Sequence, residues 1–357
     1  MRLCLDFGHQ AWSRGNDPRA AVARTIELAR TADEAGIDAI WVSEDPDGWD
    51  AFALLGALAR ETSHAVLGTG VTNPYARHPN LLAAAVATLD RLSGGRAALG
   101  LGRGQPEWHE RALGVDLGSP LAVLEETIDL LRQWWAPPHH ASIDGHIQVD
   151  DWERTIHPLQ SAPPIYLAAA GPKALALAGR IADGVVFNSL TSDTFLDNAI
   201  PSVRAAAIEA ARDPDRLAFV LWTPVTVTDN PEPILERHKD SLAMINALPG
   251  MDRLLVTPGF DVAAIMKKVR HLMRTEAVLA AGGGFPALRR ASDLVAARAA
   301  IPAELVARLA IVGPLPVVRD RLDRLATLGI THVAVAAPSP RQPLAMLGET
   351  IRALRET

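Results

Sequence analysis

Acidic side chains lie at the ends of the first two predicted strands, which run over residues 3–7 and 39–42. Asp6 is near the end of the first strand, and Glu44 and Asp45 follow the second. A carboxylate in such a place can move a proton or contact a polar cofactor. Because side chains alternate along a strand, Glu44 and Asp45 cannot both face one pocket. The alternatives are a solvated loop acid, a helix cap or a turn built by Asp45 and Pro46.

Glycines accompany two further predicted strands. Gly70 lies in the strand over 65–71, and Gly102-Arg103-Gly104 follows the strand over 96–101. Glycine weakens a strand unless another group approaches the backbone closely, as a flat ligand ring would, or a bulge is needed for curvature. Arg103 can bind an anion or an acid across the sheet edge. The glycine spacing does not fit a dinucleotide-binding fingerprint.

The segment Ala170-Gly171-Pro172-Lys173 joins a strand of small residues to a predicted helix. Pro172 suits the first helical turn, where its missing N–H costs nothing. The free N–H groups, the helix dipole and Lys173 together predict a phosphate cradle. The alternative is an ordinary strand-to-helix turn with a surface lysine.

Other kinds of site find little support. The histidines show no metal-ligand spacing, and Cys4 is the one cysteine, so we expect no catalytic metal and no disulfide. His109 is a further candidate for moving a proton. The chain has no G-x-S-x-G elbow and no phosphate-binding G-x-x-x-x-G-K-[ST] loop, which disfavours hydrolase and nucleoside-triphosphatase functions.

The elements that must position these residues alternate between short apolar strands and longer helical patterns. Strict alternation predicts parallel strands with helices outside. Eight such units indicate an α/β fold, the (β/α)8 TIM barrel, whose chemistry lies at the C-terminal strand ends; a doubly wound open sheet is the alternative. The strands are predicted over 3–7, 39–42, 65–71, 96–101, 165–169, 184–187, 217–227 and 332–336.

Three segments interrupt the alternation. Residues 104–120 read as a long loop and 137–164 as irregular chain. Residues 231–302 read as a mainly helical insertion without clear strands. We expect residues 1–357 to form one barrel domain with these insertions in its strand-to-helix loops.

Composition limits the class of protein. The 357 residues are 48% hydrophobic and 21% charged, which is typical of a folded protein. A net charge of −6 disfavours nucleic acid and a basic membrane patch, leaving a small-molecule substrate as the expected partner. No apolar run approaches the roughly 18 residues of a membrane helix, and an acid comes too early for a signal peptide. We therefore predict a soluble, cytoplasmic enzyme.

Taken together, these residues resemble the bacterial luciferase-like flavin and deazaflavin oxidoreductases. The motifs that carry the resemblance are GVTNPYARHP (70–79), TLDRLSGGR (88–96), Gly-Pro-Lys (171–173) and Ala-Asp-Gly (182–184). Within that superfamily they are most similar to the methylenetetrahydromethanopterin reductase branch, which uses coenzyme F420. The resemblance covers residues 1–188, returns at 311–335 and is absent from 231–302.

The resemblance implies a cofactor ring in the barrel mouth, pressed by a non-proline cis peptide at Gly70–Val71. Asn73 would hydrogen-bond near the ring, and Ala174 would join the phosphate cradle. The residues implied or expected to bind the cofactor are Glu44, Gly70, Val71, Asn73, Arg103, Gly104, Ala170, Gly171, Lys173 and Ala174. Those expected to move a proton are Asp6, Asp45 and His109.

The activity implied is a coenzyme F420-dependent hydride transfer to or from a small organic substrate. The alternatives are an FMN-dependent monooxygenase and a non-catalytic flavin-binding barrel subunit. Gln105 follows Gly104 where the reductase branch tends to have Asp, which leaves the methanopterin substrate open. The resemblance also implies a homodimer, with the predicted helix over 81–92 as a candidate contact.

Overall fold

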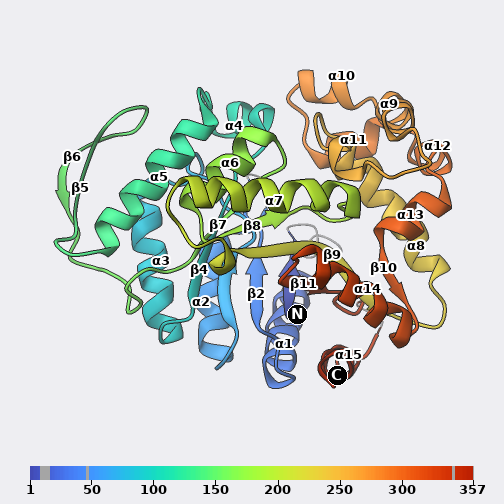
Figure 1. The fold of residues 1–357 in the computed structure, drawn as a ribbon, viewed down its shortest axis with the longest axis horizontal. Helices are drawn as coiled ribbons and strands as arrows, with labels where there is room; N and C mark the ends of the chain where they lie inside the picture. Colours follow the sequence, from blue (N-terminus) through green and yellow to red (C-terminus); the bar gives the residue numbers. More distant parts are fainter. Residues whose placement is uncertain (9–16, 46–47, 340–341, 357) are drawn as a thin grey trace.

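The computed structural model describes residues 1–8, 17–45, 48–339 and 342–356 (Figure 1). Pro46, which would complete the predicted turn after Asp45, lies outside the described residues. Eight parallel strands close into a barrel because β9 pairs with both β8 and β11. The predicted TIM barrel is therefore confirmed. Its strands are β1 (Arg2–Phe7), β2 (Ala39–Val42), β3 (Val66–Thr69), β4 (Ala97–Leu101), β7 (Ile165–Ala168), β8 (Gly184–Phe187), β9 (Ala218–Val227) and β11 (His332–Val335).

Amphipathic helices surround the strands (Figure 1). Their boundaries follow local signals: the Asp50 side chain caps the helix that begins at Ala51, and Gly94 ends another at φ 73°. The apolar helix faces and the outward strand residues form the main core. The helices are α1 (Pro18–Glu34), α2 (Ala51–Glu61), α3 (Pro79–Ser93), α5 (Pro120–Trp135), α6 (Pro172–Ile181), α7 (Asp193–Glu209), α14 (Leu315–Leu328) and α15 (Ala345–Arg355).

The barrel interior has a separate, smaller core. Trp41 and Tyr166 meet edge to face, with ring centroids 5.3 Å apart. A Cβ on Gly68 would lie 2.5 Å from the Trp41 ring, so β3 carries glycine where this indole crosses the barrel. The buried members of this cluster are Cys4, Ala39, Trp41, Ala98, Tyr166, Val186 and Val220.

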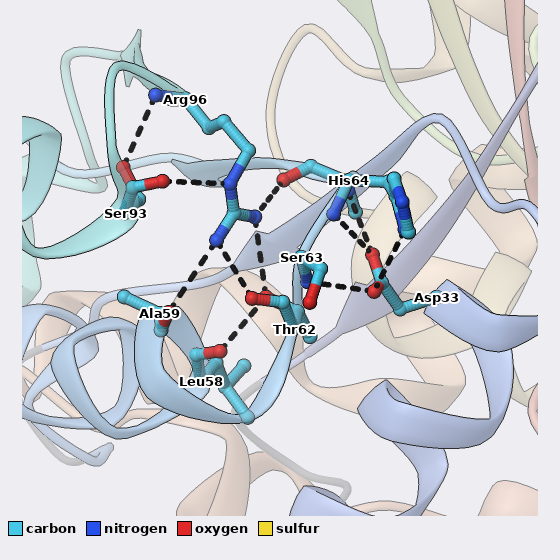
Figure 2. A network of polar contacts seen from close by, with 9 residues as sticks. Asp33, Leu58, Ala59, Thr62, Ser63, His64, Ser93 and Arg96 are labelled. Carbon is cyan, nitrogen blue, oxygen red and sulfur yellow. Dashed lines mark hydrogen bonds and ion pairs between the residues drawn. The ribbon is translucent and has the colours of Figure 1, made fainter.

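The N-terminal end of the barrel, which we call the base, is tied together by polar side chains on backbone groups (Figure 2). Asp33 at the end of α1 accepts hydrogen bonds from the N–H groups of Ser63, His64 and Ala65, at 2.7, 3.0 and 2.7 Å. Arg96, just before β4, donates to the carbonyl groups of Thr62 and Ala65, at 2.8 and 2.5 Å. These contacts fix the entry to β3 and β4.

Two predictions about the loops are wrong. The segment predicted as a loop over 104–120 contains α4 (Pro106–Leu113), whose proline start and αL glycine end, Gly114, are local helix signals. The segment predicted as irregular over 137–164 contains an antiparallel hairpin of β5 (His140–Asp144) and β6 (Gln148–Glu153). The hairpin projects beside α5 (Figure 1) and is held there by α5 side chains, among them Trp134, whose Nε1 donates to the Trp152 carbonyl at 2.9 Å.

The region after β9 is helical and gathers over one side of the barrel, drawn at the upper right of Figure 1. Its buried side chains form a core of their own, among them Leu242, Met266 and Leu305. A short strand, β10 (Ile311–Gly313), then pairs with the end of β9. The helical elements are α8 (Glu232–Ser241), a π turn (Leu242–Asn246), a 3-10 turn η4 (Asp252–Leu255), α9 (Val262–Met273), α10 (Thr275–Ala280), α11 (Phe285–Ala291), α12 (Leu294–Ala299) and α13 (Ala303–Leu309).

Among the helices that the structure describes, none combines the length and apolar character that a membrane crossing requires.

Candidate cofactor site at the barrel mouth

A backbone bulge follows β3 at the C-terminal end of the barrel, which we call the mouth. The Gly70–Val71 peptide is cis, as the resemblance implied. The bulge is bound to the end of β2: the Gly70 N–H donates to the Val42 carbonyl at 2.7 Å, and the Ser43 hydroxyl donates to the Gly70 carbonyl at 2.8 Å. The Glu44 N–H donates to the Val71 carbonyl at 3.2 Å. Hydrogen bonds from β2 thus fix the position of the bulge.

Glycines leave room around this bulge. A Cβ on Gly70 would lie 2.9 Å from the Trp41 Cβ and 3.0 Å from the Trp222 ring. A Cβ on Gly102 would lie 2.9 Å from a Val71 methyl group, and one on Gly100 would lie 2.2 Å from the Thr69 carbonyl oxygen. The strand side of the mouth is therefore bare backbone above two indole rings. Such a surface suits close approach by a planar ligand.

Trp222 places an indole nitrogen in this floor. The Nε1 donor of Trp222 is buried and makes no hydrogen bond with the residues that the structure describes. A buried donor without an acceptor is unfavourable, and such groups are rare in folded proteins. A polar edge of a bound ring system would satisfy this donor. Sequence reasoning did not single out Trp222, although a tryptophan in a barrel strand was visible.

Glu44 is held from two sides. Its carboxylate accepts a short hydrogen bond from the Thr72 hydroxyl and pairs with Arg77 Nη2 at 2.8 Å. Burial of the Arg77 guanidinium opposes its charge, but the carboxylates of Glu44 and Asp50 prevail and raise the pKa of Arg77. Glu44 is 8% exposed, so this ion pair joins the end of β2 to the segment after the bulge. Arg77 lies within the 70–79 motif but was not predicted as a site residue.

Asn73 shapes the turn that follows the bulge. Its Oδ1 accepts hydrogen bonds from the N–H groups of Tyr75 and Ala76, at 3.1 and 2.8 Å. The side chain is buried, and within the described chain its amide nitrogen makes no hydrogen bond. Asn73 therefore holds the backbone while keeping a donor available.

His109 and Asp45 belong to different elements, and the Asp45 carboxylate acts electrostatically on the His109 imidazole. His109 lies on α4, buried beneath Gly104, and a Cβ at Gly104 would lie 1.8 Å from its Nε2. Gly104 also has φ 69°, so glycine is required there by both geometry and space. Burial lowers the pKa of His109, and the Asp45 carboxylate opposes that shift. The His109 Nδ1 atom makes no hydrogen bond with the described residues.

Asp6 lies on a different side of the mouth. It lines a cavity of about 750 Å³ at the ends of β1, β9 and β11, together with Arg24 of α1 and Arg237 of α8. Neither Asp45 nor His109 lines this cavity. Of the three predicted proton carriers, only Asp6 thus lines this cavity.

The predicted phosphate cradle begins α6. Gly171 is the N-cap residue and has no side-chain hydrogen bond to the helix, so the first N–H groups of α6 are not capped by a side chain. Lys173 is exposed beside it, and neither Lys173 nor Arg103 makes a hydrogen bond or ion pair with the described residues. Arg253 of η4 adds a cation that sequence reasoning missed: its Nη1 would lie 3.4 Å from a Cβ on Gly171.

Helix α4 contacts the helical region after β9 through the side chains of Trp108 and Arg111. We call these contacts the α4 bridge. Trp108 Nε1 donates to the Gly283 carbonyl at 3.0 Å, and its ring meets Phe285 edge to face at 4.7 Å. Arg111 packs against Gly282, which has φ 70°. The corrected helix α4 therefore carries the residues that connect the barrel to the insertion.

No cluster of potential metal ligands occurs in the ranges that the structure describes. The residues at the mouth instead fit a flat organic group with an anionic tail. The bare glycine backbone and the unpartnered Trp222 donor suit its ring, and the α6 N-terminus with Lys173 and Arg253 suits a phosphate.

Comparison with known proteins identifies what this arrangement is similar to. The luciferase-like monooxygenase family matches residues 1–332. A 5,10-methylenetetrahydromethanopterin reductase of Methanolobus tindarius is 31% identical over 240 residues, covering 62% of this chain and 72% of the relative. An F420-dependent glucose-6-phosphate dehydrogenase of Nakamurella multipartita is 31% identical over 227 residues, covering 60% and 65%.

A solved structure agrees with the barrel. The coenzyme F420-dependent tetrahydromethanopterin reductase from Methanopyrus kandleri superposes with a TM-score of 0.75 at 22% identity, covering 99% of this chain and 97% of that chain. At this identity the likeness concerns the fold alone.

Proposed function

The chain belongs to the luciferase-like monooxygenase family, and on that premise we propose that it is a deazaflavin-dependent oxidoreductase that transfers a hydride between coenzyme F420 and a small organic substrate. One relative is a 5,10-methylenetetrahydromethanopterin reductase, and another is an F420-dependent glucose-6-phosphate dehydrogenase. The substrates in these two names differ. The cofactor is therefore the better supported part of the proposal, and the substrate class stays broad.

The observation that carries the proposal is the floor of the mouth. The cis bulge at Gly70–Val71 rises beside bare backbone at Gly102, and Trp222 offers an unsatisfied N–H from below. A tricyclic ring could lie on this backbone, with its polar edge toward the indole donor. When bound, the deazaflavin would supply the two-electron hydride chemistry, and the protein would supply position and electrostatics.

The remaining predicted ligands divide between the two ends of the cofactor. Asn73 would offer its free amide donor near the ring, and Glu44 would act as a positioning residue that holds Thr72 and the bulge through its buried contacts. The phosphate would bind the α6 N-terminus, where charge-assisted hydrogen bonds are strong. The residues at that end are Arg103, Gly104, Ala170, Gly171, Lys173 and Ala174.

A proton must accompany the hydride, and His109 is placed to hold it. With its pKa lowered by burial, the imidazole is neutral near neutral pH and can accept a proton at Nδ1, which has no partner in the described chain. The Asp45 carboxylate would stabilise the resulting cation. Asp6 would serve only a substrate that reaches the neighbouring cavity between β1 and β9.

Titration of the purified protein with F420 and, separately, with FMN tests the proposal, with protein and cofactor fluorescence as readouts. We expect saturable binding of F420 with a spectral change, and weaker binding of FMN. Preferential FMN binding with oxygen consumption in the presence of reduced flavin would instead establish a monooxygenase. Binding of a cofactor without turnover of any substrate or acceptor would favour a non-catalytic subunit.

The homodimer implied by the resemblance has a candidate surface on α3. Leu81 and Leu92 are 65% and 41% exposed, and their spacing of eleven residues places them on one helix face. Sedimentation of Leu81→Asp against the wild type tests this contact, because a charge in a dimer core would shift the protein toward the monomer.

A further inference from the structure

We propose that the cavity at the ends of β1, β9 and β11 holds the substrate, and that the substrate is an apolar organic acid whose anionic end meets Arg24 and Arg237. This inference rests on the proposed function, because it names the chemical class of molecule that would exchange the hydride. The cavity has a volume of about 750 Å³, within the range of roughly 300–1,000 Å³ that is usual for small-molecule sites. Residues of α1, α8 and α15 complete its wall.

The walls of the cavity are mainly apolar. Leu28 of α1, Val225 of β9 and Leu347 of α15 approach it from three different elements, and all three side chains are buried. On α1 the lining residues recur every three or four positions, so that one face of this helix is turned toward the cavity. A hydrocarbon body would bind favourably in this space, because each methylene group that leaves water adds to the affinity.

Two arginines bring positive charge to this apolar space. Arg237 makes no hydrogen bond or ion pair with the residues that the structure describes. Arg24 uses its Nη2 atom on backbone carbonyl groups, including that of Ser339 at 2.8 Å, while its Nε and Nη1 atoms have no partner in the described ranges. A guanidinium presents its N–H donors as a planar fork that matches a carboxylate, so these two side chains can recognise an anionic group.

The two acids in the lining already have contacts within the chain. Asp17 caps α1, where its Oδ1 accepts the Arg19 N–H at 2.9 Å and the positive end of the helix dipole favours its charge. Asp6 at the end of β1 also interacts within the protein. The donors that the cavity leaves for a ligand therefore belong to arginines, and an anion complements them better than a cation does.

The cavity lies next to the floor on which we place the cofactor ring. Strand β9 contributes to both, with Trp222 in the floor and Val225, three residues further along, in the cavity wall. At about 3.3 Å per residue these two positions are roughly 10 Å apart. A molecule whose reacting carbon lies on the ring would therefore extend its apolar body into the cavity and bring its anionic end to the arginines.

Binding of probes that share one apolar chain and differ in their head group tests the inference. Dissociation constants of octanoate, 1-octanol and octylamine are measured by calorimetry, with and without saturating F420. We expect octanoate to bind roughly tenfold more tightly than the neutral and cationic probes, because only its carboxylate can pair with the arginines. Hexanoate, which is shorter by two methylene groups, should bind roughly tenfold more weakly than octanoate. Octanoate should bind without displacing F420.

Two variants with matched controls locate the probe. Ala21→Leu fills part of the cavity from α1 and should weaken octanoate binding roughly tenfold, whereas Ala23→Leu adds the same side chain to an exposed position of that helix outside the lining and should keep the wild-type affinity. Arg237→Gln should remove most of the preference for octanoate over 1-octanol. Its control, Arg19→Gln, removes an exposed arginine that does not line the cavity.

Three results would overturn the inference while F420 binding leaves the proposed function intact. They are equal binding of octanoate and octylamine, unchanged octanoate affinity in both Ala21→Leu and Arg237→Gln, and displacement of F420 by octanoate, which would assign the cavity to the cofactor. If F420 does not bind the wild type, the proposed function fails, and the substrate role of the cavity fails with it even where octanoate binds.

Discussion

The two ends of the barrel use the same kinds of polar residue in opposite ways. At the base, Asp33 accepts three backbone hydrogen bonds, and Arg96 donates to backbone carbonyl groups of the segment before β3 (Figure 2). At the mouth, Arg103, Lys173 and Arg253 have no hydrogen-bond or ion-pair partner among the described residues. The indole donor of Trp222 is also unsatisfied there.

This difference between base and mouth separates the motifs of the family resemblance that support the scaffold from those that can bind a ligand. Asp90, within the 88–96 motif, accepts from the N–H groups of Ala97 and Leu159, at 3.1 and 2.7 Å, and Asp183, within 182–184, accepts from Ile165 at 2.9 Å. Both acids therefore join backbone segments at the base and serve the scaffold. The motifs at 70–79 and 171–173 lie at the mouth, where polar groups are left for a ligand.

Replacing Asp33 with alanine should have the largest effect on stability. The change leaves three N–H groups without their acceptor, so we expect the free energy of unfolding to fall by about 3–5 kcal/mol. Urea unfolding measures the loss, and F420 affinity of the folded protein should stay unchanged. Asp293→Ala is the matched control, since Asp293 accepts one exposed N–H and its loss should cost about 1 kcal/mol.

A stability loss at Asp33 similar to that of the control would contradict the role we assign to the base. A large change in the F420 affinity of Asp33→Ala would contradict our inference that the base supports the fold and only the mouth binds the cofactor.

Two buried histidines test whether the barrel and the insertion unfold together. Burial lowers the pKa of His332 at the base and of His238 in α8 to about 4. Between that value and the unfolded pKa of about 6.5, the unfolded chain binds more protons, so this contribution to stability is full above about pH 6.5 and lost as the pH falls toward 4. We expect about 2 kcal/mol per histidine to be lost between about pH 7.5 and about pH 5.

Chemical unfolding at the two pH values measures this loss in the wild type, in His332→Gln and in His238→Gln. Each variant should lack one histidine's share of the pH dependence in a single transition. Two separate transitions, with one histidine acting on each, would show that the insertion unfolds by itself.

Gly171→Val should affect the mouth and spare the base. Gly171 has φ −86°, which valine adopts without strain, so the melting temperature should change little. The larger side chain would cover the first N–H groups of α6, and we expect F420 affinity to fall roughly tenfold to a hundredfold. Gly171→Ala is the control, because its Cβ would meet only the flexible Arg253 side chain at 3.4 Å and should have a small effect.

Unchanged affinity in the valine variant would place the phosphate elsewhere. A fall in melting temperature as large as that of Asp33→Ala would make Gly171 a structural residue.

Trp108→Ala should give the smallest effect, and a local one. The change removes the hydrogen bond to Gly283 and the contact with Phe285, so opening of α4 should become easier by about 1–2 kcal/mol. Hydrogen exchange in residues 106–113 should then accelerate roughly fivefold to thirtyfold, while exchange at the base stays slow. Trp108→Phe keeps the ring contact and should show an intermediate rate. Equal rates in all three proteins would contradict the role of Trp108 in holding α4 against the helical region.

Sequence reasoning succeeded where the signal is local. The barrel strands were predicted because short apolar runs alternate with longer helical patterns, whereas the cis peptide at Gly70–Val71 was implied only by the family resemblance. It failed for α4, because eight residues flanked by glycines carry a weak helical pattern, and for the β5–β6 hairpin, because its strands are mostly exposed and polar. The roles of the predicted site residues remain predictions that the binding experiments address.

The amino-acid sequence by itself determined the alternation of strands and helices and the uncapped start of α6, because each depends on residue types and neighbours within a few positions. Only the tertiary structure decided which distant groups meet there. Trp108 contacts Gly283 across 175 residues, and Arg253 comes to lie against Gly171. Such contacts arise from the packing of whole helices, where many weak apolar interactions set the positions of a few polar side chains, and no local pattern encodes that sum.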